Sequence, residues 1–220
     1  MKLLAIETAT SACSAALQVH NEICFRYEVA PQKHAELILG MINDLLSEAG
    51  LRLPDLDCLA FGRGPGAFTG VRIAAGVIQG LSYGAGLPVV PVSTLAVLAQ
   101  GATGQSSRLY CAIDARMQEV YWCRYHASNG IVVPVDDEAV NRPGQINLES
   151  DESWFGIGSG WNVYPDELCN SINQKISGFD GERFPHARDI LPLALSACQR
   201  GETLSAAEIK PVYLRNDVTG

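Results

Sequence analysis

The sequence lacks most motifs that mark metal-dependent and nucleophilic enzymes. Its four histidines form no H-x-x-x-H or H-E-x-x-H pair, so two histidines on one helix face cannot hold a metal. There is no G-x-S-x-G segment, although a dispersed Ser-His-Asp triad stays open. None of the seven cysteines forms a C-x-x-C pair, and most lie in apolar runs. This distribution is typical of reduced, buried thiols in a cytoplasmic protein.

Basic charge and long apolar runs are also scarce. The 16 Lys and Arg residues face 24 Asp and Glu residues, and the net charge of −8 argues against a free-standing nucleic-acid binder. A subunit whose partner carries the basic surface stays possible. The apolar start, Leu3 to Ile6, is too short for a secretion signal. The uncharged span 73–107 is broken by glycines and prolines, so we expect buried elements there and no membrane span.

The chain has two halves that open with the same pattern. Lys2 to Glu7 is an apolar run ending in a carboxylate, and Leu109 to Asp114 repeats it. A hairpin pattern follows each run, which predicts an internal duplication of a β-β-β-α-β-α unit. We expect one domain over residues 1–103 and a second, less regular one over 104–220, whose C-terminal segment could pack back on the first. Apolar spacing predicts helices over 32–49, 69–83, 94–100 and 189–200.

The segment from Gly62 to Arg72 joins a predicted strand to a predicted helix. Four glycines, a proline and two arginines there have the composition of an anion-binding loop. The glycine spacing is one residue off the dinucleotide fingerprint, and there is no G-K-[ST] of a P-loop. A structural turn, an anion site and a partner-facing loop all stay open. The candidate, vestigial phosphate-site residues are Glu7, Thr8, Gly64, Gly66, Thr69 and Gly70.

The two helices on either side of this loop are apolar over a wide arc. Such helices either pack on two sides within one chain or pair with another chain. The second helix also carries small residues, including Gly76 and Gly80, that allow close helix approach. Core packing and a partner interface are both open readings. The interface candidates are His34, Leu37, Ile38, Met41, Ile42, Leu45, Arg72, Ile73, Val77 and Leu81.

Several segments together resemble the TsaB (formerly YeaZ) family of bacterial tRNA threonylcarbamoyladenosine biosynthesis proteins. They run nearly from end to end of the chain, so the resemblance covers almost all of it. Each segment alone is weak, and the set is specific. The segments are Leu3 to Thr10, Gly62 to Ile73, Pro91 to Leu95, Ala112 to Tyr121 and Pro211 to Arg215.

The resemblance implies an actin/sugar-kinase-like α/β fold of two ribonuclease-H-like halves. It implies a non-catalytic cytoplasmic subunit that pairs with the paralogue TsaD, and with the ATPase TsaE, to modify adenosine 37 of tRNAs reading codons that begin with A. Homodimers are expected in isolation, tRNA contact only through the complex, and ATP and metal on the partners. Thr94 and Leu98 stand where TsaD has its metal-binding histidines. An M22 glycopeptidase label, given to some relatives, has no support in the motifs.

Two hypotheses from different classes follow. The first is the accessory subunit, pairing with TsaD through residues 32–49 and 69–83. The second is a small-molecule kinase or ATPase of the same fold, using Glu7, Asp114 and the glycine loop.

Overall fold

The computed structural model describes residues 1–215, which form two compact units. The first unit comprises residues 1–97 and 185–212, and the second comprises residues 98–184 and 213–215. The sequence analysis had predicted a single domain boundary, between residues 103 and 104. In the structure the chain passes between the two units three times, after residues 97, 184 and 212. The second passage occurs because the helix after residue 185 packs on the sheet of the first unit.

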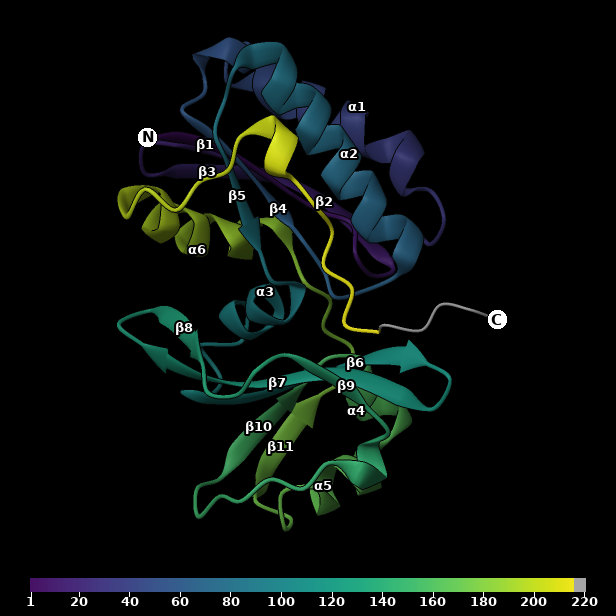
Figure 1. The fold of residues 1–220 in the computed structure, drawn as a ribbon. Coiled ribbons are helices and arrows are strands. Elements are labelled where there is room, and N and C mark those ends of the chain that lie inside the picture. Colours follow the sequence, from purple (N-terminus) through teal and green to yellow (C-terminus); the bar gives the residue numbers. More distant parts are fainter. Residues whose placement is uncertain (216–220) are drawn as a thin grey trace. The chain divides into compact units, whose positions relative to one another are not determined.

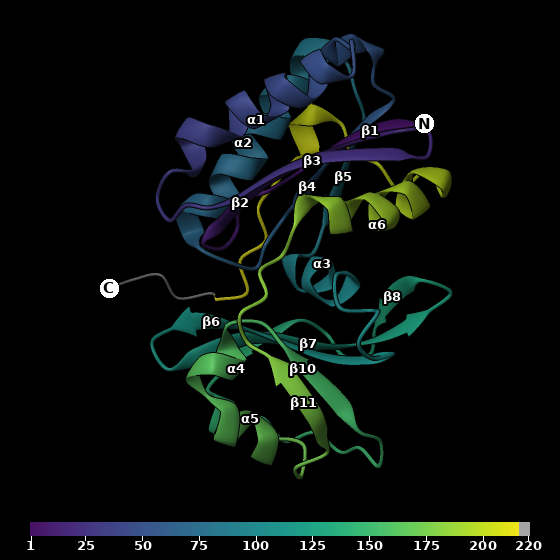
Figure 2. The same ribbon diagram turned by 180° about the vertical axis from the view of Figure 1, so that it is seen from behind.

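The first unit is a five-stranded sheet with helices on both faces (Figures 1 and 2). Its strand order is β3-β2-β1-β4-β5, with β2 antiparallel and β4 parallel to β1. The strands are β1 (Lys2–Glu7), β2 (Ala12–Val19), β3 (Glu22–Val29), β4 (Cys58–Gly62) and β5 (Val89–Val92). The helices are α1 (His34–Glu48), α2 (Phe68–Ala85), α6 (Ala187–Gln199) and the short η1 (Leu53–Asp55) and η3 (Ala206–Glu208), and α3 (Thr94–Gln100) follows β5.

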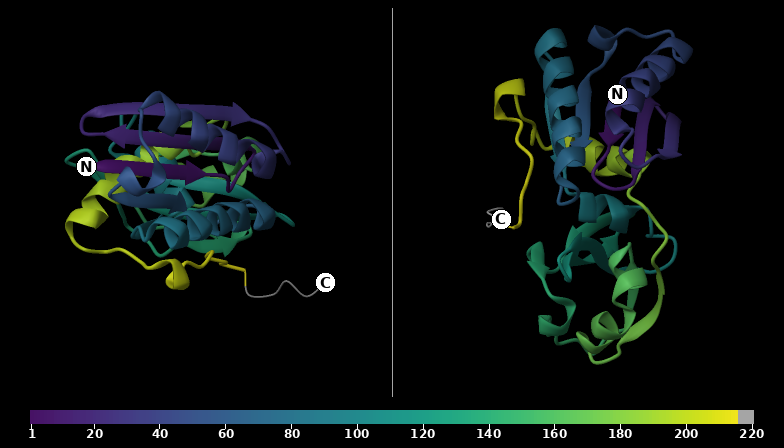
Figure 3. Two further views of the ribbon diagram at one scale, coloured as in Figure 1. Left: turned by 90° about the horizontal axis from the view of Figure 1, so that it is seen from above. Right: turned by 90° about the vertical axis from the view of Figure 1, so that its right-hand side faces the viewer.

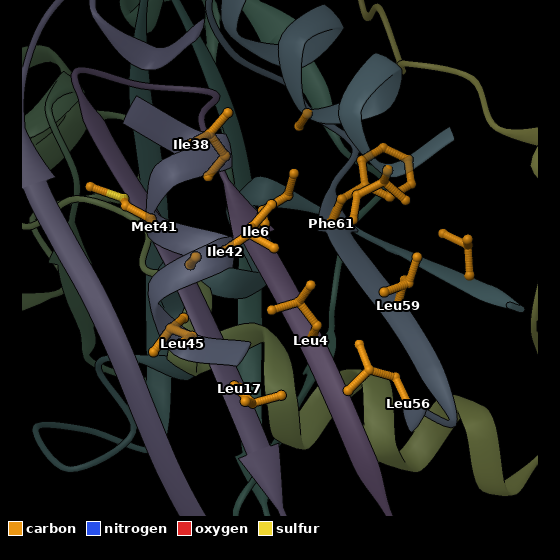
Figure 4. Close-up of a cluster of buried hydrophobic side chains, with 14 of the residues drawn as sticks. Leu4, Ile6, Leu17, Ile38, Met41, Ile42, Leu45, Leu56, Leu59 and Phe61 are labelled. Carbon is orange, nitrogen blue, oxygen red and sulfur yellow. The ribbon is translucent and has the colours of Figure 1, made fainter. Parts of the chain in front are cut away.

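Alternation along β1 sorts the core of this unit into two layers. Leu4 and Ile6 face α1 and α2. Figure 4 shows them near side chains of α1 and of β4. Leu3 and Ala5 face the opposite way, toward α6. A strand with apolar residues on both faces is expected where helices cover both faces of a sheet.

The second unit has a sheet of the same order around its first strand, β11-β10-β6-β7-β8, with β9 paired to β7. Since β6 and β10 occupy the places of β1 and β4, the predicted duplication and the actin/sugar-kinase-like fold class are confirmed. The strands are β6 (Arg108–Arg116), β7 (Glu119–Ser128), β8 (Ile131–Pro134), β9 (Ala139–Asn141), β10 (Trp154–Ile157) and β11 (Ile176–Asp180). The helices are α4 (Gly160–Val163), α5 (Pro165–Asn170) and the short η2 (Pro143–Gln145).

The expected β-β-β-α-β-α pattern is complete in the first unit alone. Between β8 and β10 the described chain has no α-helix, and β9, η2 and the irregular segment 146–153 stand there instead. The polar, acidic composition of residues 136–153 explains this departure, because such a segment has no apolar stripe to lay on a sheet. The core of this unit is aromatic, and includes Tyr110, Trp122, Trp154 and Trp161.

Candidate functional site

The glycine loop between β4 and α2 is tied to its own chain on several sides. The Ala67 N–H donates to the Ala9 carbonyl at 2.8 Å, and the Thr8 hydroxyl donates to the Gly70 carbonyl at 2.8 Å. The Thr94 N–H donates to the Gly64 carbonyl at 2.9 Å. The Gly64–Pro65 peptide bond is cis. These bonds attach the loop to the end of β1 and to the start of α3.

Its glycines allow close approach of other parts of this chain. A Cβ on Gly62 would overlap the carboxylate of Glu7, and Cβ atoms on Gly66 and Gly70 would overlap the carbonyls of Ala9 and Thr8. Gly64 has φ +101°, and a Cβ there would lie 2.8 Å from the Val212 carbonyl oxygen. These four positions therefore need glycine because the loop packs closely on other parts of its own chain.

Glu7 is fully buried at the end of β1. One carboxylate oxygen, Oε1, accepts a 2.7 Å hydrogen bond from the Ala9 N–H, and Oε2 lies 3.5 Å from the Thr94 hydroxyl. Burial raises the pKa of Glu7 from 4.5 to about 7, and the hydrogen bonds from Ala9, Thr8 and Thr94 oppose that rise. Glu7 is thus a carboxyl group that can hold or release a proton near neutral pH.

The counterpart of Glu7 in the second unit is Asp114, near the end of β6. Its Oδ1 accepts a hydrogen bond from the Arg116 N–H at 3.0 Å, and the Arg116 guanidinium lies 3.2 Å from Oδ2. The Asp114 N–H donates to the Ser159 hydroxyl at 3.1 Å. Both acids therefore bind the backbone two residues on, but Asp114 has a cationic neighbour and Glu7 is sealed among neutral groups.

Four of the ten interface candidates fill the core. Ile38, Met41, Ile42 and Leu45 pack on the sheet beneath α1, so little or none of their surface is open to a partner. The reason is that one side of the wide apolar arc on α1 faces its own sheet. His34 is the first residue of α1. It is buried, and its Nε2 has no hydrogen-bond partner.

The remaining candidates lie at or near the surface. Leu37 on α1 is half-buried, as are Ile73, Val77 and Leu81 on α2. Arg72 is exposed, and its guanidinium carbon lies 3.6 Å from the centre of the Phe68 ring. The outer side of α2 therefore keeps apolar groups within reach of solvent.

Three glycines widen this outer side. Gly76, Gly80 and Gly84 recur every fourth residue on α2, are exposed, and have no atom within 4 Å of where a Cβ would be. We call Arg72, Ile73, Gly76, Gly80, Tyr83 and Gly84 the α2 outer face. Figure 3 shows α2 along the side of its unit, with the segment around η3 beside it.

Tyr83 was missed by the sequence reasoning. Its side chain is 85% exposed, and it lies three residues after Gly80, so it continues the same helical stripe. That spacing is the signal that could have found it. Beside Tyr83 is a groove of about 440 Å³ between the end of α2 and residues 203–206. Exposed Leu39 on α1 and exposed Phe68 were missed as well.

No group of three or more His, Cys, Asp or Glu side chains in residues 1–215 is placed to hold a metal ion. Within the same residues, no helix is both long and apolar enough to cross a bilayer. The glycine loop, with its dense hydrogen bonding, and the open α2 outer face are two candidate functional regions of the first unit.

Comparison with known proteins points to the same family as the sequence segments described above. Residues 25–215 match the family model described as TsaD, tRNA N6-adenosine threonylcarbamoyltransferase. The chain is 43% identical to the tRNA threonylcarbamoyladenosine biosynthesis protein TsaB of Escherichia coli, over 99% of this chain and 96% of that protein. It is 40% identical to the TsaB of Haemophilus influenzae, over 100% of this chain and 95% of that protein.

A solved structure gives the same answer for the fold. YeaZ from Pseudomonas aeruginosa superposes with a TM-score of 0.90 at 45% identity, covering 97% of this chain and 99% of that one. A second structure with the same values is titled an uncharacterized protein with similarity to peptidase YEAZ. Near-complete coverage at this identity, in sequence and in fold, shows that the chain belongs to the TsaB (YeaZ) family, within the wider group matched by the TsaD model.

Proposed function

We propose that this chain is a non-catalytic accessory subunit of a tRNA-modifying complex. In this proposal it pairs with a TsaD homologue, together with TsaE, for threonylcarbamoylation of adenosine 37 in tRNAs that read codons beginning with A. The names of the full-length relatives, tRNA threonylcarbamoyladenosine biosynthesis proteins, support the pathway. The match to a threonylcarbamoyltransferase model supports descent from a common ancestor with the catalytic subunit.

The α2 outer face carries the pairing part of the proposal. It combines half-buried Ile73 with exposed Tyr83 and three glycines that have open space beside them. Glycines at every fourth position let a second helix approach the backbone closely, and apolar neighbours supply area to bury. The partner is therefore expected to present a helix. In the absence of TsaD, a second copy of this chain would occupy the same face as a homodimer.

The glycine loop supports a subunit that does not catalyse alone. Its glycines pack closely against Glu7 and the backbone of residues 8 and 9, which supports a structural role for the loop. ATP and metal are accordingly expected on the partner subunits. Titration of the isolated chain with ATP–Mg²⁺ tests the kinase or ATPase alternative. Micromolar binding would favour that alternative, and an absence of heat would favour the accessory role.

The net charge of −8 supports tRNA contact through the complex and not by the isolated chain. The proposed place of action is the cytoplasm, where tRNA is modified.

Gly80→Glu is the sharpest test of the pairing. The substitution adds a charged side chain to the α2 outer face, and replacing an exposed helical glycine favours the helix. The variant should therefore fold as well as the parent, fail to co-purify with the TsaD homologue, and support little tRNA modification in a reconstituted assay. Tyr83→Glu should act in the same direction.

The matched control is Val133→Glu on β8, another exposed apolar position but in the second unit. It should leave pairing unchanged. Parental co-purification by both Gly80→Glu and Tyr83→Glu would place the interface elsewhere and overturn this assignment.

A further inference from the structure

Two cysteines of the first unit bring their sulfur atoms together. The Sγ of Cys198 on α6 lies 3.0 Å from the Sγ of Cys58 on β4, although 140 residues separate them in sequence. The Cys198 thiol donates to Cys58, and the Cys58 thiol donates to the Leu59 carbonyl at 3.3 Å. A disulfide bond is about 2 Å long, so a small side-chain movement would allow these sulfurs to bond.

The two thiols differ in their access to solvent. Cys58 is buried in the layer between the sheet and α6, whereas Cys198 is half-buried in the last turn of α6, next to exposed Gln199. A small reagent in solution therefore meets Cys198 first. Burial raises the pKa of the Cys58 thiol well above its ordinary value, so Cys58 is not the group that attacks such a reagent first.

We propose that Cys58 and Cys198 form an oxidisable dithiol that hydrogen peroxide converts into a disulfide, linking α6 to β4. In the first step the Cys198 thiolate attacks one peroxide oxygen, the O–O bond breaks, and the departing hydroxide takes up a proton to become water. Cys198 is left as a sulfenic acid.

In the second step the Cys58 sulfur attacks the sulfur of that sulfenic acid. The S–O bond breaks, and the hydroxide leaves as water with the proton of Cys58. Over both steps the two thiols lose two electrons, and one peroxide is reduced to two waters. The 3.0 Å separation makes Cys58 the resolving thiol, because it is already in contact with the sulfur that it must attack.

A second cysteine pair in the chain provides an internal control. Cys111 on β6 and Cys123 on β7 are directly opposite each other in the sheet of the second unit. Both are completely buried, and the Cys123 thiol donates to the Asp136 carbonyl at 3.2 Å. A reagent cannot reach either sulfur without unfolding the sheet, so this pair should stay reduced when the other is oxidised.

Peptide mapping of the unmodified full-length protein tests the proposal directly. The reduced chain is diluted, treated with hydrogen peroxide, alkylated and digested without reductant. Mass spectrometry should find the peptides of Cys58 and Cys198 joined, lighter than their sum by two hydrogen atoms, and separated again by dithiothreitol. Cys111 and Cys123 should be recovered as thiols that alkylate only after unfolding.

Variants separate the two roles. Cys58→Ser should leave Cys198 as a sulfenic acid that dimedone traps, and Cys198→Ser should leave Cys58 unoxidised at the same peroxide dose. Cys24→Ser removes an exposed cysteine on β3 and should behave as the parent. Free Cys58 and Cys198 in the peroxide-treated parent, or a disulfide that joins Cys24 instead, would overturn the proposal. That result is read in the parent chain, so it does not depend on whether a variant folds.

Discussion

In the first unit, β4 leads through the glycine loop into an 18-residue helix, whereas in the second unit the corresponding strand β10 leads into a helix of four residues. Both connections pack against the end of the first strand. Gly62, Gly66 and Gly70 are in contact with residues 7–9, and Gly158 and Gly160 are in contact with Ala112. The shared feature is a glycine turn packed against the strand that carries an acid at or near its end.

The hydrophobic cores of the two units also differ in composition. The first unit packs aliphatic residues on both faces of its sheet, while the second holds all three tryptophans of the chain together with Tyr110. A helix as long as α2 has an outer side to offer a partner, and a four-residue helix has none. The duplicated topology thus supports a candidate binding surface in one unit and a closed aromatic core in the other.

This difference also makes the two units separately measurable. Tryptophan fluorescence reports on the second unit, because Trp122, Trp154 and Trp161 all lie there. Far-ultraviolet circular dichroism is weighted toward the long helices α1, α2 and α6 of the first unit.

Gly70→Ala should cause the largest change in stability, and it should affect the first unit more than the second. The new methyl group would overlap the Thr8 carbonyl, so we expect a loss of about 3 kcal/mol or more in the free energy of unfolding. The circular dichroism transition should shift further than the fluorescence transition. Gly76→Ala in the same helix has open space and should stabilise by about 0.5–1 kcal/mol. Equal effects of the two substitutions would show that the loop is not closely fitted.

Glu7→Gln should remove a pH dependence of stability from the first unit. The unfolded chain releases this proton near pH 4.5 and the folded chain near pH 7, so the stability contributed by neutral Glu7 is complete below pH 4.5 and is lost as the pH rises to about 7. Above pH 7 the amide should stabilise by up to about 3 kcal/mol.

Denaturant titrations of the Glu7→Gln variant across this pH range provide the measurement. The control is Asp114→Asn, which loses the ion pair with the exposed Arg116 guanidinium and should change stability by less than about 1 kcal/mol. An unchanged pH profile in Glu7→Gln would mean that Glu7 titrates as an ordinary carboxyl.

His186→Asn should reduce the loss of folding stability that occurs as the pH falls from 6.5 to about 4. Burial, with a contribution from Arg188, lowers the pKa of His186 from 6.5 to about 4. Stability from this group is therefore present above pH 6.5 and lost as the pH falls to about 4. Because the ring is partly exposed, we expect an effect of about 1 kcal/mol.

Asparagine at position 186 keeps an acceptor for the Arg188 N–H that caps α6, and it does not titrate. If the variant lost stability at acid pH as steeply as the parent, another group would be responsible.

Tyr110→Phe should also have a small effect, confined to the second unit. It removes a buried hydrogen bond between the Tyr110 hydroxyl and Ser171 Oγ, 3.1 Å apart, at a cost of about 1 kcal/mol. The ring keeps its edge contact with Trp161, so the fluorescence transition should move while the circular dichroism of α1 and α2 stays in place. A larger shift by circular dichroism would show that the units unfold together.

Much of the fold was predictable because its local patterns agree with its packing. The helices that became α1, α2, α3 and α6 were located to within a few residues, and the repeated apolar run ending in an acid revealed the duplication. Strands β9 and β11 and helices α4 and α5 were not predicted. They are three to six residues long, and a pattern of that length does not separate a strand from a turn.

The sequence predicted which helices carry the candidate site, but not which side of each helix faces solvent. Apolar residues on α1 and α2 indicate that the helices are buried or paired, yet the spacing does not say which side meets the sheet. Ile38 and Leu45 proved to be core, and Tyr83, Leu39 and Phe68 proved to be exposed. The glycines of the loop marked close approach, but whether a phosphate or the chain's own backbone comes close depends on residues 50 or more positions away.

By itself, the sequence determined the family, the duplicated strand pattern, the acid ending each first strand and the glycine turn. These depend on short-range order and on residue type, which the chain carries locally. The sequence raised the return of the C-terminal segment to the first unit, and the tertiary structure showed that α6 makes it. The tertiary structure alone decided that Glu7 is buried, that Cys58 meets Cys198, and which side of α2 stays open. Each of these outcomes joins residues far apart in the chain, and burial and contact at such distances exist only after the sheet and its helices have packed.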